Sequence, residues 1–214
     1  MIKGIDRRAL NSVRDNSVSF SRRRLWLLAV AGVALMIFIT GMTFILAKAV
    51  VGQWLLQNAW EQAVEVGAPQ RPWPWADFLV AAELRIPELG IRAYVLNIDS
   101  GEALAFGPGF SRTNPHDEVK VISGHRDTHF LFIRDLKLGM RIELHSLGRS
   151  APEAFAVQHQ TVVDSRRAQL PPVAPNSLIL LTCFPLDTMS TNGPMRYLSI
   201  AHPQTLKVSD GVML

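Results

Sequence analysis

The sequence lacks an excess of positive charge beyond its first 24 residues. The whole 214-residue chain has a formal net charge of +4, from 22 Lys and Arg against 18 Asp and Glu. Residues 1–24 hold seven of the basic and two of the acidic residues, which leaves 15 basic and 16 acidic residues in the rest. A nucleic-acid-binding domain carries its basic face on the folded part. The charge distribution therefore argues against a nucleic-acid partner.

Charged residues are absent from residues 25–47, an apolar run of 23 residues. At about 1.5 Å per residue, a helix of this length covers roughly 34 Å, enough to cross a hydrocarbon core of about 30 Å. A cleaved signal peptide is the alternative, because residues 47–49 (Ala-Lys-Ala) resemble a cleavage site. Its apolar region is typically only about 7–15 residues long, so we predict an uncleaved transmembrane helix.

The basic residues that precede this run predict its orientation. Seven of them lie before the span, and only Lys48 lies close behind it. The positive-inside bias then keeps residues 1–24 as a basic cytoplasmic tail, whose lack of apolar periodicity predicts disorder. The rest of the chain would face the periplasm or the cell exterior, held by a single span among the lipids of the inner (cytoplasmic) membrane.

Cysteine is nearly absent: Cys183 is the only one, so no disulfide forms within the chain. A lone cysteine is commonly a small buried apolar side chain. In an exported chain, however, an unpaired thiol without a function is a liability, which favours a functional thiol. Cys183 also ends the apolar run 178–183, so we expect it at the edge of the core, where a reactive group is accessible.

Residues 48–76 are predicted to form a juxtamembrane helix and a linker. Residues 53–66 repeat apolar side chains with a helical period, which fits a helix leaving the membrane or a partner-binding helix. Residues 67–75 contain three prolines and cannot continue a helix. The folded domain is therefore predicted to span residues 77–214.

This domain has short extended runs punctuated by glycine and proline, and no internal repeat. Such a pattern predicts a mostly β domain, either a closed barrel or a sandwich. The eight strand candidates are residues 84–87, 91–96, 102–106, 119–123, 141–145, 155–163, 178–183 and 196–201.

His125 is the candidate acid or base for Cys183, because a neighbouring imidazole favours the reactive thiolate. It follows the strand candidate 119–123 and a glycine. His125 and His129, four residues apart, could alternatively be metal ligands. No third ligand and no zinc-protease glutamate accompanies them, so we expect neither a metal nor another cofactor.

Arg196 is the third candidate. Strand alternation places it on the same side as Leu198 and Ile200. It is either a surface arginine whose stem covers the core or a fixed cation that stabilises an oxyanion.

These features resemble the sortase family. The resemblance rests on residues 123–127 (Ser-Gly-His-Arg-Asp), 181–185 (Leu-Thr-Cys-Phe-Pro) and 193–197 (Gly-Pro-Met-Arg-Tyr). Further similarity lies at residues 84–91 and 104–109. The His-Arg-Asp-Thr-His-Phe stretch that begins at His125, and the Cys-Phe-Pro sequence, look closest to sortases of Gram-negative proteobacteria.

The resemblance implies a sortase-type eight-stranded β-barrel after the transmembrane helix, and a cysteine transpeptidase that anchors surface proteins. Cys183 would attack the Thr–Gly bond of a Leu-Pro-x-Thr-Gly (LPxTG)-like sorting signal and form a thioacyl enzyme. His125 would protonate the leaving amine and deprotonate the incoming amine acceptor. Arg196 would position the substrate and stabilise the oxyanion.

Thr182 and Asp127 also match the family pattern, and the resemblance implies that they contribute to substrate binding. A carboxylate commonly fixes an imidazole tautomer, so Asp127 is a candidate for orienting His125. Two other functions stay open: a membrane-anchored binding domain with an inert cysteine, and a cysteine hydrolase that uses water as acceptor. The ordered set of motifs favours the transpeptidase.

Overall fold

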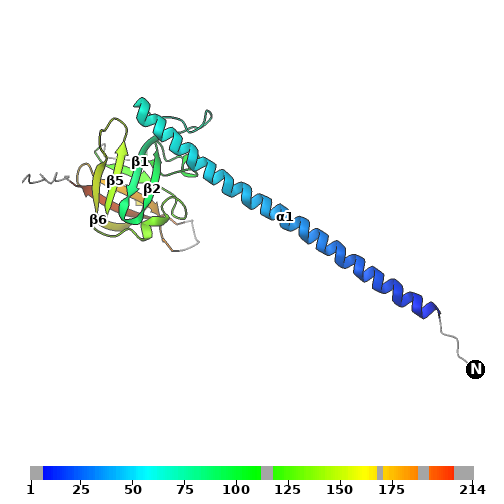
Figure 1. The fold of residues 1–214 in the computed structure, drawn as a ribbon. Coiled ribbons are helices and arrows are strands. Elements are labelled where there is room, and N and C mark those ends of the chain that lie inside the picture. Colours follow the sequence, from blue (N-terminus) through cyan, green and yellow to red (C-terminus); the bar gives the residue numbers. More distant parts are fainter. Residues whose placement is uncertain (1–6, 112–117, 168–170, 188–192, 205–214) are drawn as a thin grey trace, which may run out of the picture. The chain divides into compact units, whose positions relative to one another are not determined.

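The structure, a computed structural model, describes residues 7–111, 118–167, 171–187 and 193–204 (Figure 1). The chain divides into two compact units, Met1–Val51 and Gly52–Leu214.

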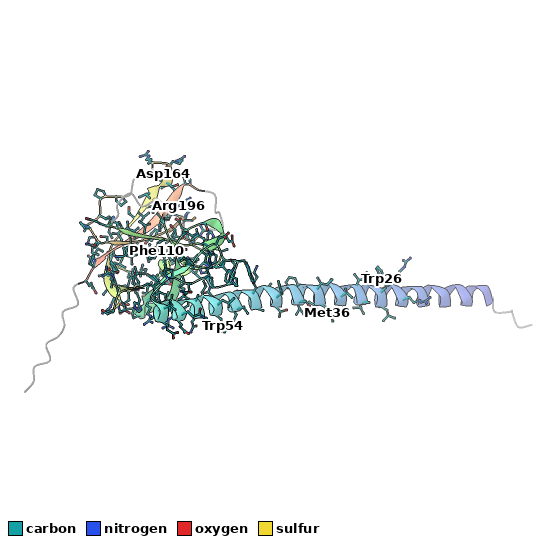
Figure 2. The ribbon with its side chains drawn as sticks, turned by 90° about the horizontal axis from the view of Figure 1, so that it is seen from above. Trp26, Met36, Trp54, Phe110, Asp164 and Arg196 are labelled. Carbon is teal, nitrogen blue, oxygen red and sulfur yellow. The ribbon has the colours of Figure 1, made fainter. Side chains whose placement is uncertain are left out.

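The first unit is made by helix α1 (Arg7–Val66), which continues into the second. Its stretch Arg22–Val66 contains an 18-residue window with a mean hydropathy of 2.3 and is long and apolar enough to cross a membrane, as predicted. Large apolar side chains are exposed along it, and Figure 2 shows Trp26 and Met36 projecting from the helix. Such a helix is a candidate membrane span, because none of the residues in its most apolar window is buried in the part of the chain that the structure describes.

The helix begins earlier than the sequence suggests. Residues 1–24 are predicted to be disordered, whereas the structure is helical from Arg7 onward. Neither proline nor glycine occurs between residues 7 and 31. A helix nucleated in the apolar run therefore meets no breaker as it extends toward the N-terminus, and each added residue contributes a hydrogen bond.

α1 ends at Val66, where Gly67 adopts a left-handed conformation with φ of 74° and donates its amide to Ala63 O at 2.9 Å. This arrangement suits glycine, which has no Cβ to clash. Pro69 follows two residues later.

The last turns of α1 pack on the β domain within the second unit. Trp60 is 5% exposed, and its ring meets the His145 ring edge-on with centroids 5.4 Å apart. The same core cluster contains Phe78 and Leu96 from the β domain. The other buried side chains on this side of the helix are Leu56, Ala59 and Ala63. Part of the apolar stripe in residues 53–66 is thus covered by the chain itself, while Trp54 and Val64 stay exposed.

We expect Trp60→Ala to lower the free energy of unfolding by about 3–5 kcal/mol, because it removes a large buried ring and leaves a cavity. Trp54 lies six residues earlier on the same helix but is 58% exposed, so Trp54→Ala is the matched control, with a change within about 0.5 kcal/mol. Denaturant titration of the full chain in detergent micelles measures both. Equal effects of the two substitutions would show that the packing of Trp60 contributes no stability.

Eight strands form a closed barrel in the order β1-β2-β3-β4-β7-β8-β6-β5, which confirms the predicted architecture. Figure 1 labels β2, β1, β5 and β6, which are consecutive neighbours in this order. The strands are β1 (Val80–Ile86), β2 (Ile91–Leu96), β3 (Gly109–Phe110), β4 (Lys120–Ser123), β5 (Arg141–Ser146), β6 (Glu153–Asp164), β7 (Leu178–Cys183) and β8 (Met195–Pro203). Short helices are η1 (Pro87–Leu89), α2 (Gly101–Leu104), η2 (Leu131–Arg134) and η3 (Ser165–Arg167).

One predicted strand is wrong. Residues 102–106 were expected to be extended, but they overlap the helical turn α2 and the residues that follow it. Ser100 caps this turn, since its hydroxyl accepts a hydrogen bond from the Ala103 amide at 3.2 Å. The missing eighth strand is the two-residue β3 (Gly109–Phe110).

The barrel strands have two apolar faces. On β7, Leu178 and Leu180 belong to the cluster inside the barrel, together with Ile122 of β4. The alternate residue Ile179 belongs to a separate cluster on the outer face, together with Val121 of β4. The side chains at the end of β7 therefore divide between these two faces.

Candidate functional site

The barrel places the ends of β4 and β7 side by side. These strands pair in parallel, with Ser123 opposite Leu181. The pairing continues one residue beyond β4, because the Gly124 amide donates to Leu181 O at 3.1 Å. Both strands then end at the same edge of the sheet: β4 continues to His125, and β7 ends at Cys183. The structure thus brings together two residues that lie 58 positions apart.

Arg196 lies directly opposite Cys183 in the antiparallel pairing of β7 with β8. Opposed residues in such a pair have Cβ atoms about 4.5–5.5 Å apart and point to the same face. Alternation along β8 places Arg196 on the outer face with Leu198 and Ile200, as predicted. Figure 2 shows Arg196 at the same end of the barrel as Asp164. The candidates from three strands therefore meet at one edge.

The main chain holds the Arg196 guanidinium. Its Nη1 donates to Gly193 O at 2.8 Å and to Met195 O at 2.9 Å. Its Nε and Nη2 have no hydrogen-bond partner among the residues that the structure describes. A half-buried arginine fixed in this way can present its remaining N–H groups to an anion.

Cys183 is a free, half-buried thiol, and His125 is exposed. The turn after His125 is held by its own backbone, because the Phe130 amide donates to His125 O at 3.0 Å. Phe130 itself is buried beneath this turn, and a Cβ on Gly124 would lie 2.7 Å from its ring. Glycine at position 124 therefore allows the backbone of this turn to pack closely against the Phe130 ring.

Thr182 is 2% exposed, and its hydroxyl donates to Gly124 O at 2.7 Å. The hydroxyl predicted to contact substrate is thus occupied in joining β7 to the segment before His125. A buried hydroxyl with this partner holds two strands in register.

Asp127 contacts Arg126 in place of the expected histidine. Arg126 Nε donates to Oδ1 at 2.8 Å and Nη2 donates to Oδ2 at 2.7 Å, so both carboxylate oxygens bind one guanidinium. These bonds hold the pKa of the Asp127 carboxyl below its usual value. Within the described residues, no hydrogen bond joins Asp127 to His125.

Arg126 is the residue that sequence reasoning missed. It is 3% exposed, although arginine is usually a surface residue. Its Nη1 donates to Pro185 O at 2.6 Å, two residues beyond Cys183. No local signal marked this contact, because it crosses from one strand end to the other.

His129 lies on the same segment as His125 but is half-buried. Burial lowers the pKa of its imidazole, and a hydrogen bond to the Ala105 backbone partly opposes this effect. The nearby hollow of about 510 Å³ is lined by His129, Tyr94 and Phe132 among others, and does not include Cys183. Among the described residues, no group of three or more His, Cys, Asp and Glu side chains could hold a metal ion.

The lowered pKa of His129 predicts a pH-dependent stability. As the pH falls below about 6.5, the unfolded chain gains the proton first, so the free energy of unfolding decreases. One histidine contributes a slope of at most about 1.4 kcal/mol per pH unit. His129→Gln should flatten the curve between pH 7.5 and 5.5, measured by denaturant titration. Replacement of the exposed His159 by Gln should leave the slope unchanged, and equal slopes in all three proteins would contradict the prediction.

Comparison with known proteins identifies the family. A family model of the sortase domain matches residues 84–204, which include the three strand ends described above. The chain belongs to the sortase family. This confirms the resemblance read from the motifs, and sortases are known as cysteine transpeptidases that act on surface proteins outside the cytoplasm.

Solved sortase structures share the fold. Sortase A from Corynebacterium diphtheriae is 20% identical, with a TM-score of 0.51 over 75% of this chain and 87% of that one. Sortase C1 from Streptococcus suis is also 20% identical, with a TM-score of 0.51 over 61% of this chain and 76% of that one. No curated protein shows a significant sequence match. At these identities the structures establish the barrel alone.

Proposed function

We propose that the chain is a membrane-anchored cysteine transpeptidase with Cys183 as its nucleophile, His125 as its acid and base, and Arg196 as its oxyanion partner. The observation that carries this proposal is the strand register. Cys183 is opposite Arg196 across β7 and β8, and it ends β7 beside the β4 end that leads to His125. A thiol, an imidazole and a fixed cation are the groups that acyl transfer needs.

In the first step, the Cys183 thiolate attacks the threonine carbonyl carbon of a Leu-Pro-x-Thr-Gly (LPxTG)-like sorting signal. The carbonyl oxygen becomes an oxyanion, which the N–H groups of Arg196 stabilise. When the C–N bond breaks, the His125 imidazolium protonates the glycine amine as it leaves. The products are a thioacyl enzyme, a free amine and a neutral imidazole.

In the second step, an amine acceptor attacks the thioester carbonyl. Neutral His125 takes the proton from this amine, a new amide bond forms, and the thiolate leaves as the intermediate collapses. The imidazolium–thiolate pair is thereby restored. Because the same residue first gives and then takes a proton, no further acid is required.

The outer-face cluster on β4, β7 and β8 is largely buried, but near Cys183 it reaches an apolar surface through partly buried side chains, one of them on β6. Its partly exposed members include Leu181 and Val163. This surface suits the leucine and proline of a sorting signal, since apolar side chains bind where water is released. Asp127 and Thr182 are kept on the substrate side in this proposal only because they match the family pattern. Their hydrogen bonds, from Thr182 to Gly124 O and from Arg126 to Asp127, favour an orienting role.

The membrane arrangement is part of the proposal. Residues 1–24 would lie in the cytoplasm, residues 25–47 would span the inner membrane in contact with lipid, and residues 48–76 would lead to the catalytic domain at 77–214. Supporting observations are the exposed apolar surface of α1 and the charge bias around the span. A place among the sortases of Gram-negative proteobacteria is supported by the sequence that begins at His125.

The test incubates the full chain in micelles with a library of peptides that end in LPxTG-like signals, with and without an amine such as triglycine. We expect an intact-mass increase on Cys183 equal to the acyl fragment, and a ligated peptide when the amine is present. An adduct that yields only the hydrolysed acid, even at high amine concentration, would establish a hydrolase. Absence of any adduct across the library would favour a binding domain with an inert thiol.

A further inference from the structure

Two hydrogen bonds join the segment that carries Cys183 to the segment that carries His125. The first has its donor on the Cys183 segment, and the second has its donor on the His125 segment. Thr182 precedes Cys183, and its hydroxyl donates to Gly124 O at 2.7 Å, just before His125. Arg126 follows His125, and its Nη1 donates to Pro185 O at 2.6 Å, just after Cys183. Each proposed catalytic residue is thus flanked by a contact to the opposite segment.

Arg126 is held more firmly than a surface arginine. It is 3% exposed, and a buried guanidinium is stable only when it is paired and hydrogen-bonded. Asp127 pairs with Arg126 through two hydrogen bonds, of 2.8 and 2.7 Å. The Asp127 side chain is 53% exposed. This bidentate contact fixes the plane of the guanidinium and so fixes the direction of Nη1. The carboxylate therefore orients the arginine, and the arginine reaches Pro185.

We propose that Arg126 is a positioning residue: its guanidinium, oriented by Asp127, joins the segment after Cys183 to the segment after His125 and thereby sets the separation of the thiol from the imidazole. The effect on turnover rests on the proposed function, whereas the joining of the two segments does not. Asp127 then influences the position of His125 through Arg126 and the backbone, in addition to the electrostatic interaction between the two side chains.

The fixed separation matters because the proton and the thiol must be aligned in both steps. A displacement of about 1 Å in a reacting group can reduce the rate by roughly 100-fold. Arg126 lies outside the outer-face apolar surface that would hold the sorting signal. Loss of its contact should therefore change kcat far more than KM, which separates positioning from substrate binding.

The first measurement is steady-state transpeptidation by the full chain. We expect Arg126→Met to lower kcat by about 30- to 100-fold with KM within about twofold. Arg126→Lys should recover part of this loss, because an ammonium can contact Asp127 or Pro185 O but has no planar fork to hold both. Arg134→Gln is the matched control. Arg134 reaches the same Asp127 carboxylate at 3.8 Å from an exposed position, so its loss should leave kcat within twofold.

The second measurement is amide hydrogen exchange in the same proteins, which needs no activity. Arg126→Met should speed exchange in residues 124–130 and in residues 183–186 together, and Arg134→Gln should change neither segment. If the wild-type chain ligates no peptide but this paired change occurs, the joining role stands and the transpeptidase proposal fails. If Arg126→Met does not fold, Arg126→Lys is used instead, with the same two measurements: the changes in kcat and KM, and the rate of hydrogen exchange in the two segments.

Three results would overturn the inference. Wild-type kcat in both Arg126 variants would show that the contact positions nothing. A loss carried wholly by KM would make Arg126 a substrate-binding residue. Faster exchange confined to residues 124–130 would show that Pro185 is not held by the arginine.

Discussion

Cys183→Ala is expected to abolish transpeptidation, with kcat/KM falling by at least about 10,000-fold, while the barrel remains folded. Alanine has no nucleophilic atom, and an oxygen nucleophile cannot form the thioester on which the second step depends. The half-buried thiol lies at the edge of the sheet, so we expect its removal to change the free energy of unfolding by less than about 1 kcal/mol. Peptide ligation assays and denaturant titration measure the two quantities.

The scarcity of cysteine makes a second control available. Because Cys183 is the only cysteine, any loss of activity caused by a thiol reagent is assigned to this residue. Iodoacetamide should inactivate the wild-type chain at the same rate as it adds one label, and substrate peptide should protect against both. Full activity in Cys183→Ala would eliminate every thiol mechanism and contradict the proposed function.

His125→Ala is expected to lower kcat by about 1,000- to 10,000-fold, the upper part of the range for general acid–base catalysis. The loss is large because His125 acts in both steps, first as the acid for the leaving amine and then as the base for the incoming one. His125 is exposed, so its replacement should leave the fold intact and open a space beside the thiol. Added imidazole should then restore part of the activity in proportion to its concentration.

His129→Gln is the matched control for this experiment, since His129 lies four residues away on the same segment. Its activity at pH 7.5 should stay within about threefold of wild type. Equal losses in the two variants would indicate that the segment as a whole is sensitive, and would remove the specific assignment to His125. A His125→Ala enzyme with wild-type kcat would require a different proton donor.

The sequence predicted well where one chemical pattern fixes the local structure. The apolar run that ends at Cys183 and the alternation in residues 141–145 became β7 and β5 with bounds within a residue or two. Their apolar content specifies a buried strand without reference to partners. β3 was missed because two residues carry no periodicity, and residues 102–106 were misread because the cap from Ser100 outweighs a short apolar run.

For the candidate site, the sequence indicated candidate residues but not the contacts that support them. Cys183, His125 and Arg196 were selected by residue type and motif order, and the strand register places the ends of β4, β7 and β8 beside one another. The contacts of Arg126 and Thr182 depend on which strands become neighbours in the parallel pairing, and no local pattern encodes that choice. The apolar stripe on residues 53–66 has the same limit. Its helical period predicts an apolar face, but the period does not predict that the barrel covers part of this face.

The parallel pairing of β4 with β7 also has a consequence for the order of folding. The segments joined by Thr182 and Gly124 are 58 residues apart, and β5 and β6 lie between them in the chain. Parallel strands need a long crossover, and such distant contacts form slowly. We therefore expect the thiol to stay apart from its imidazole until the barrel closes. In the proposed arrangement, the domain would cross the membrane and begin to fold with its thiol still apart from the imidazole, and the proposed activity would appear only in the finished domain.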